Sequence, residues 1–196
     1  MLALHRPFID EEGIGMAQPE EVTLGRVLLV EYEQMKAEQK GRIGLRDNLL
    51  YAMLAATAAV IAATIPSSSH TALLLLLPPI SVLLGWTYLV NDEKISAIGR
   101  YVRNSLAPRL AEVLGRDVEL FGWESAHRQD QRRRSRKGLQ LAVDLLAFGI
   151  GPGAALIVFW VNGHLTGPLL VISAAETVAL VVLGSQITLY ADLSSD

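Results

Sequence analysis

Apolar residues are concentrated in four long runs that contain almost no charge. The runs are Leu49–Ile65, Thr71–Val90, Leu139–Val161 and Pro168–Leu189. A helix needs roughly 20 mostly apolar residues to cross the hydrocarbon core of a bilayer. Each run is close to that length, and too little polar chain remains to wrap four buried helices. The pattern therefore predicts an all-α membrane protein with four transmembrane helices arranged as two hairpins.

Composition narrows the class of protein further. The apolar set AVILMFWYC supplies 51% of the residues and the charged set DEKR 19%, whereas soluble domains average about 45–50% and 25%. The chain also has no cysteine. These values exclude an ordinary soluble domain, a disulfide-stapled secreted domain and a disordered chain.

The distribution of charge predicts the orientation in the membrane. All 17 Lys and Arg residues lie within residues 6–46 and 94–137, and the short connections 66–70 and 162–167 contain none. Positively charged segments stay on the cytoplasmic side. We therefore expect both termini and the middle segment to be cytoplasmic, with two short turns outside.

The segments outside the runs carry helical patterns of their own. Leu24, Leu28 and Met35 fall on one stripe of a helix that begins near Pro19, and a bend is expected near Gly41. Pro108 is expected to break or kink the pattern in the middle segment. The predicted division is a flexible tail at 1–18, a cytoplasmic helix at 19–48, a transmembrane hairpin at 49–90 (spans 49–65 and 71–90), a cytoplasmic helical segment at 91–138, a second hairpin at 139–190 (spans 139–161 and 168–189) and a cytoplasmic tail at 191–196.

Two carboxylates lie inside the apolar runs. Glu176 is about midway along the fourth run, with Ser173 and Thr177 nearby. An ionisable group at the bilayer centre costs about 2.5–3.5 kcal/mol on insertion scales and marks a candidate functional site. The alternative is a protonated or hydrogen-bonded Glu176 that holds helices together.

Asp144 lies five residues into the third run, close to the cytoplasmic interface. It either forms an interfacial ion pair or contributes to an acidic ring at the mouth of a cation pore. The basic side chains within its reach are Arg46, Arg136 and Lys137. We assign a path for protons or cations to Glu176, Asp144, Ser173 and Thr177.

Proline and glycine interrupt the second and third runs. Proline inside a helix removes a backbone hydrogen bond and kinks the helix, so these residues are candidates for gating or kinking, although both types are common in membrane helices. Gly149 and Gly153 also form a small-xxx-small pair, which suits packing within one subunit or between subunits. The candidates are Pro78, Pro79, Gly149, Gly151, Pro152 and Gly153.

A basic run precedes the third apolar run. It fits a positive-inside anchor that binds anionic lipid headgroups, or a site where arginine side chains bind an anionic ligand such as a nucleotide. Its residues are Arg128, Arg132, Arg133, Arg134, Arg136 and Lys137. The four histidines are scattered, no enzyme motif is present, and we expect neither a metal nor a cofactor nor a catalytic residue.

Two segments carry a resemblance to a known group of proteins. Gly85–Tyr101 reads GWTYLVNDEKISAIGRY and Phe121–Glu124 reads FGWE. They resemble a group of uncharacterised, largely actinobacterial, four-span integral membrane proteins, and the resemblance covers about Leu24 to Ile187. It implies a bacterial inner-membrane protein and names no activity. In layout the chain is also similar to small membrane effectors of bacterial anti-phage systems, which implies an antiviral defence role.

These observations lead to one principal functional hypothesis and two alternatives. The principal hypothesis is a non-enzymatic homo-oligomer that conducts ions or permeabilises the membrane and is gated through its cytoplasmic helices. Beside the lipid bilayer and further copies of the chain, its partners would be an anionic nucleotide ligand or a cytoplasmic protein. The alternatives are a small proton-coupled transporter that uses Glu176, and a membrane scaffold that recruits a cytoplasmic partner.

Overall fold

The computed structural model describes residues 23–66, 68–115, 120–121, 133–163 and 165–191. Within these residues every regular element is a helix and none is a strand. Four continuous helical rods are long and apolar enough to cross a membrane, namely 24–64, 70–114, 137–162 and 167–190. The four apolar runs are therefore confirmed as helical, and the architecture is that of a multi-pass membrane protein.

The first rod is the single helix α1 (Leu24–Thr64), which has 41 residues. At 1.5 Å per residue it is about 60 Å long, twice the thickness of the hydrocarbon core. The Thr23 hydroxyl accepts a hydrogen bond from the Arg26 N–H at 3.4 Å and caps the helix. The helix is unbroken at Gly41. The start expected near Pro19 and the tail at 1–18 lie outside the described residues.

The other rods combine α-helices with shorter helical turns. The second consists of the 3-10 helix η1 (Ser68–Leu76), α2 (Leu77–Tyr101), the π-helix η2 (Val102–Leu106) and α3 (Ala107–Leu114). The third consists of α5 (Arg133–Leu145), the π-helix η3 (Leu146–Ile150) and α6 (Gly151–Asn162). The fourth is α7 (Gly167–Tyr190).

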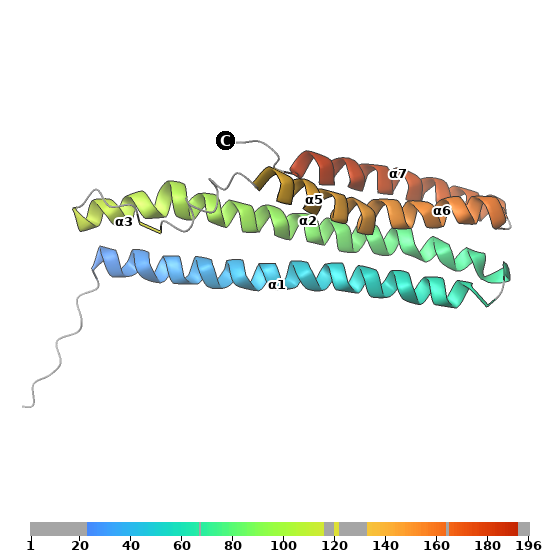
Figure 1. Ribbon diagram of the computed structural model, residues 1–196, viewed down its shortest axis with the longest axis horizontal. Coiled ribbons are helices and arrows are strands. Elements are labelled where there is room, and N and C mark those ends of the chain that lie inside the picture. The colour runs from blue at the N-terminus through green and yellow to red at the C-terminus, as the bar shows by residue number, and fades with distance from the viewer. Residues whose placement is uncertain (1–22, 67, 116–119, 122–132, 164, 192–196) are drawn as a thin grey trace, which may run out of the picture.

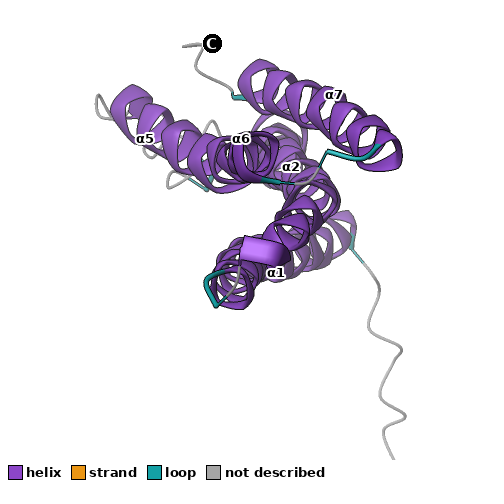
Figure 2. Ribbon diagram, turned by 90° about the vertical axis from the view of Figure 1, so that its right-hand side faces the viewer, coloured by secondary structure: helices purple, strands orange, loops and turns teal. Residues whose placement is uncertain are grey.

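The rods have unequal lengths, and this divides the molecule into two sections (Figure 1). α1 and the rod of α2, η2 and α3 run along the whole molecule, whereas α5, α6 and α7 cover only one half of it. We call that half the four-helix section and the remainder, residues 24–47 and 91–114, the extension. Viewed from the end, α2 lies between α1 on one side and the pair α6 and α7 on the other (Figure 2).

Each section has its own buried core. The four-helix section has a large cluster built around Met53, Leu77, Phe148, Phe159 and Leu183. The extension has a small one formed by Leu28, Val102, Leu106 and Leu110. Leu28 and Met35 belong to the stripe predicted from the sequence, and both pack in this small cluster.

Each proline of the second and third rods lies where the type of helix changes. Pro78 and Pro79 lie in the first turn of α2, and residues 71–76 form a 3-10 helix instead of the α-helix expected there. Pro152 and Pro108 likewise occupy the first turns of α6 and α3, each directly after a π-helix. The missing N–H is tolerated in a first turn, so Pro108 does not break the second rod. The residue that ends this rod is Gly115, in the left-handed conformation with φ of 60°.

A buried hydroxyl compensates for Pro152. In an α-helix the Phe148 carbonyl would accept from the N–H of residue 152, which proline lacks. The fully buried Ser81 hydroxyl on α2 donates to this carbonyl at 2.5 Å. One turn further on, a Cβ atom on Gly85 would lie 2.8 Å from Leu183 Cδ2 and 3.1 Å from Phe148 Cδ1. These two small residues let α2 approach η3 and α7 closely.

Candidate functional site

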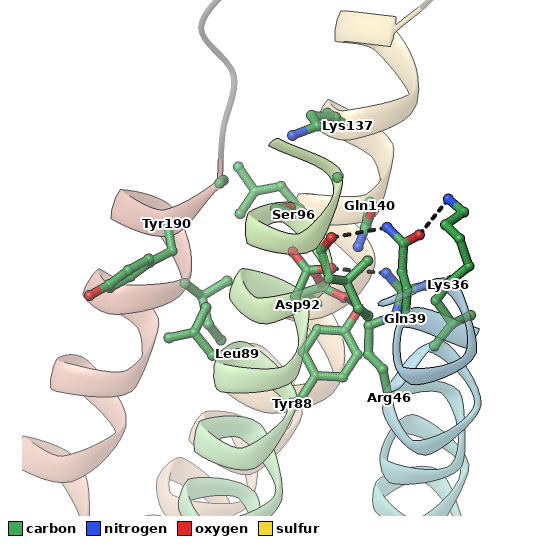
Figure 3. A pocket seen from close by; sticks show the side chains of 17 residues that line it. Lys36, Gln39, Arg46, Tyr88, Leu89, Asp92, Ser96, Lys137, Gln140 and Tyr190 are labelled. Carbon is green, nitrogen blue, oxygen red and sulfur yellow. Dashed lines mark hydrogen bonds and ion pairs between the residues drawn. The ribbon is translucent and has the colours of Figure 1, made fainter. Parts of the chain in front are cut away.

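A polar cavity of about 510 Å³ lies where the four-helix section meets the extension. All four rods contribute to it: Lys36, Gln39 and Arg46 come from α1, Tyr88, Asp92 and Ser96 from α2, Lys137 and Gln140 from α5, and Tyr190 from α7 (Figure 3). We call it the junction cavity. Five charged side chains line it, namely Lys36, Arg46, Asp92, Lys137 and Asp144.

Arg46 joins α1 to α2 at this level. Its Nη1 lies 2.9 Å from Oδ1 of Asp92, and its Nη2 lies 3.2 Å from Oδ1 of the neighbouring Asp47. The guanidinium carbon is also 6.0 Å from the centre of the Tyr88 ring, at the outer limit of a cation–π contact. One side chain of α1 therefore contacts both a carboxylate and an aromatic ring of α2.

Tyr88 continues this chain of contacts to α5. Its hydroxyl donates to Oδ1 of Asp144 at 2.7 Å, and both side chains are buried. A buried carboxyl group requires hydrogen-bond donors to offset its lost hydration. The Tyr88 ring is 5.1 Å from the Phe148 ring, which places the polar contact directly on top of the large apolar core.

Further side-chain hydrogen bonds lie along the facing sides of α1 and α2. Lys36 donates to Gln39 at 2.8 Å, and Gln39 donates to the backbone carbonyl of Ile95 at 3.1 Å. Arg42 donates to the buried Asn91 at 3.2 Å. The two helices are thus linked by polar contacts over several turns.

The extension also has a polar contact between its helices beyond the cavity. Tyr101 donates its hydroxyl to Glu31, and this bond raises the pKa of the Tyr101 hydroxyl. Nearby, the rings of Tyr32 and Phe121 are stacked with centroids 3.9 Å apart. Both contacts lie beside the small core of the extension.

Glu176, the other acidic residue within the apolar runs, lies outside the junction cavity. Glu176 is partly buried on α7 and lines neither this cavity nor the apolar groove beside α6. Its Oε2 atom is buried and has no hydrogen-bond partner among the described residues. Ser173 donates to the Leu170 carbonyl and Thr177 to the Ser173 carbonyl, both within α7. The structure therefore does not bring Glu176 and Asp144 together.

The glycines of the third rod border a second, apolar space. Gly149 and Gly153 line a groove of about 600 Å³ between η3, α6 and α7, together with Trp160 and Thr177. A Cβ atom on either glycine would meet nothing within 4 Å. Gly151 differs, since its Cβ would lie 3.3 Å from the Leu146 carbonyl oxygen. The two outer glycines thus leave open space and do not bring helices of one chain together.

Only part of the predicted basic run can be placed. Arg128 and Arg132 lie outside the described residues, as do the side chains of Arg133, Arg134 and Arg136, whose backbone belongs to α5. Lys137 lines the junction cavity. Among the described residues no group of His, Asp and Glu side chains is arranged to hold a metal ion.

Sequence reasoning identified Asp144 and Lys137 but not their companions on α1 and α2. Lys36, Gln39 and Arg46 were missed as a group, although their spacing of three and seven residues places them on one helix face. Arg46 was named only as a basic side chain within reach of Asp144. Tyr88, which is the residue that donates to Asp144, carries no local signal of this role.

Comparison with known proteins identifies no relative of this chain. No protein-family model matches the chain, and neither a curated protein nor a solved structure matches it. The class of the protein therefore rests on its own helices, which define a multi-pass membrane protein.

Proposed function

We propose that the chain is a homo-oligomer in a bacterial inner membrane that conducts ions and is gated through the extension. In this proposal α1 and α2 form one transmembrane hairpin and α5 to α7 the other. The extension and both termini are cytoplasmic, because every Lys and Arg residue lies in the sequence segments 6–46 and 94–137, outside both short connections. Residues 66–70 and 162–167 form the outer turns.

This orientation can be tested directly because the chain has no cysteine. Glu112→Cys places a thiol on α3, and Thr166→Cys places one just before α7. Both positions are exposed. A membrane-impermeant maleimide applied to intact spheroplasts is expected to label Thr166→Cys, and to label Glu112→Cys only after lysis. The reverse labelling pattern would contradict the proposed orientation.

The observation that carries the conduction proposal is the buried, unpartnered oxygen of Glu176 midway along α7. A carboxyl group at this depth needs a hydrogen-bond partner, a water-filled path or a proton. The hydroxyls of Ser173 and Thr177 donate to backbone carbonyls of α7 and are not directed to it. Because this oxygen is enclosed within one copy, water admitted when the helices around α7 move apart would supply the partner that the closed state lacks.

The junction cavity supports gating through the extension. Asp92, Arg46, Tyr88 and Asp144 form a continuous series of contacts from α1 through α2 to α5. A shift of α1 in the extension would therefore act on Tyr88 and, through it, on Asp144 at the base of the third rod. Asp144 in turn lies one π-turn away from the open groove beside Gly149 and Gly153.

Glu176→Gln tests conduction because it removes the charge and keeps the shape. In liposomes containing the purified protein, cation flux is expected to change by about tenfold, which corresponds to roughly 1.4 kcal/mol in the barrier. Glu112→Gln makes the same chemical change at an exposed position on α3 and is expected to leave flux unchanged. Equal flux in wild type and Glu176→Gln would contradict the role of Glu176.

The same assay separates the other candidates. A proton-coupled transporter using Glu176 would show flux only with a substrate present, together with proton release. A scaffold is favoured by one observation, the exposed apolar side chains Leu24, Val27, Val30 and Leu114 at the far end of the extension. Exposed apolar side chains mark a contact with a protein partner where they form a contiguous patch. In that case flux would be absent, and substitutions on the surface of Lys94–Arg109 would disrupt the complex.

A further inference from the structure

The helix α1 is covered on one side only. It packs mainly against the second rod, which lies between α1 and the pair α6 and α7 (Figure 2). In the apolar span of α1 only 11% of the residues are buried, against 44% in the second rod. The side of α1 that faces away from α2 is therefore uncovered in the described part of the chain.

A seven-residue repeat lies on this uncovered side. In the extension, nine of the 24 residues of α1 are charged, yet one exposed stripe carries no charge. Its members are alternately three and four residues apart, which is the spacing of the a and d positions of a coiled coil. In the extension they are Val27, Val30, Gln34, Ala37, Gly41 and Gly44, and all six are exposed.

The same repeat continues without a break into the apolar span of α1. Its next members are Asn48, Tyr51, Ala55, Ala58 and Ala62, which are again exposed and uncharged. A repeat of 3.5 residues drifts slowly around a straight helix, and helices that share it wind around each other in a left-handed supercoil. We call the whole set of a and d positions, from Val27 to Ala62, the outer seam.

Two glycines of the outer seam point to the close approach of another helix. Gly41 and Gly44 lie in the interior of α1, where glycine is less favourable than alanine. A Cβ atom on either residue would meet nothing within 4 Å, so packing within one chain does not require glycine there. Small residues allow two helix backbones to approach closely, and Ala55 and Ala58 extend this property into the apolar span.

A second copy of α1 fits the outer seam along its whole length. Lipid could cover only the part in the membrane, and a soluble protein only the part in the extension. Another α1 matches the seam in length, spacing and lack of charge, and every copy inserts in the same orientation, so two copies meet in parallel about a two-fold axis. Asn48 at an a position would fix the register, as single buried asparagines do in coiled coils.

The area of such a contact is sufficient for a stable dimer. A strip of α1 about 60 Å long and about 10 Å wide has an area of about 600 Å². Two copies would therefore bury about 1,200 Å² in total, which is the lower end of the range for specific protein complexes.

We infer that α1 forms a parallel two-helix coiled coil with α1 of a second copy along the outer seam. This interface rests on the homo-oligomer of the proposed function and assigns a surface to it, but it does not depend on ion conduction. Because the seam begins in the extension, the coiled coil would also join the extensions of the two subunits.

Single cysteines test the seam directly, because the chain has none of its own. Val30→Cys, Ala37→Cys and Gly44→Cys each place a thiol at a d position, whereas Leu29→Cys and Ile43→Cys place it at exposed positions outside the seam. In native membranes under mild oxidation, the seam variants are expected to form a disulfide-linked dimer at least about fivefold faster than the other two. Equal yields in the two sets, including no cross-link in either, would overturn the inference, as would linkage to a protein of another mass.

A bulky residue at the closest approach gives a second test. Gly41→Leu is expected to raise the dissociation constant of the dimer in detergent by about tenfold or more, measured by sedimentation, while the helix content from circular dichroism is retained. Gly138→Leu is the matched control, because Gly138 is an exposed glycine of α5 whose Cβ would also meet nothing within 4 Å. Unchanged dimerisation in folded Gly41→Leu would overturn the inference.

The same preparations separate this interface from conduction. A dimer that cross-links at the seam but shows no cation flux in liposomes would support the interface and contradict conduction. Flux from an oligomer that does not cross-link at the seam would contradict the interface and leave conduction intact.

Discussion

The four-helix section and the extension differ in how much charge their surfaces carry. In the four-helix section Leu83, Val171 and Leu189 are 70%, 71% and 75% exposed, whereas Ser81 and Ser173 are buried. In the extension four apolar side chains and Asn91 are buried, and the exposed surface carries most of the charge of the described residues. An almost wholly apolar exposed surface suits a hydrocarbon solvent, and an exposed surface rich in charge suits water. In the proposed orientation, one continuous helix α1 would therefore extend from the hydrocarbon core of the membrane into water.

The two sections also differ in how their helices are joined. In the four-helix section α2 approaches its neighbours closely at Ser81 and Gly85, with a large apolar core around them. In the extension the small core is supplemented by polar contacts between α1 and α2, such as Gln39 with Ile95 and Arg42 with Asn91. Such contacts contribute roughly 0.5–1.5 kcal/mol each in water. The extension is therefore expected to open first, which is what a gating element requires.

Leu106→Ala is the strongest test of this difference in stability. Leu106 is fully buried in a core of four residues, and large-to-small changes of this kind cost about 2–5 kcal/mol. We expect amide hydrogen exchange at residues 24–35 and 102–114 to accelerate by about 30-fold or more. Exchange at residues 77–90 should not change. Hydrogen exchange followed by mass spectrometry of the protein in nanodiscs measures both.

The matched control is Leu183→Ala, the same substitution at a buried position of the four-helix section. It is expected to raise exchange in α7 and in the part of α2 around Gly85, and to destabilise the whole chain. Faster exchange throughout the four-helix section in Leu106→Ala would show that the two sections unfold as one unit. The comparison between them would then fail.

The sequence predicted the helices of both sections better than it predicted their contacts. A run of about 20 apolar residues has few alternatives to a helix in a bilayer, so the four rods followed from local pattern alone. The stripe of Leu28 and Met35 likewise required only the helical period. The pattern did not determine the type of helix. The run Leu73–Leu77 is as compatible with an α-helix as with the 3-10 helix that precedes Pro78.

The junction cavity was predictable only in part, for a physical reason. Tyr88 and Asp144 are 56 residues apart, and their contact depends on how α5 is rotated against α2. That rotation is set by close packing around Gly85 and Ser81, which no period of the sequence encodes. The charges of the site were visible in the sequence, but their pairing was not.

A test with a smaller expected effect concerns the contact between α2 and η3 in the four-helix section. Ser81→Ala removes the hydroxyl that donates to the Phe148 carbonyl. A buried carbonyl left without a donor costs about 1–3 kcal/mol, so the free energy of unfolding in detergent is expected to fall by this amount. Pro152→Ala restores a backbone N–H at residue 152. If the π-helix η3 then becomes α-helical, this N–H can donate to the Phe148 carbonyl in place of the Ser81 hydroxyl.

If Ser81 compensates for Pro152, the two substitutions cannot be additive. In the Pro152→Ala background, Ser81→Ala should lower the free energy of unfolding by about 1 kcal/mol less than it does in the wild type. Thr57→Ala in both backgrounds is the control, because the Thr57 hydroxyl donates to the Met53 carbonyl within α1. Additive losses for Ser81 and Pro152 would mean that close packing of small residues, and not the hydroxyl, holds α2 against the π-turn.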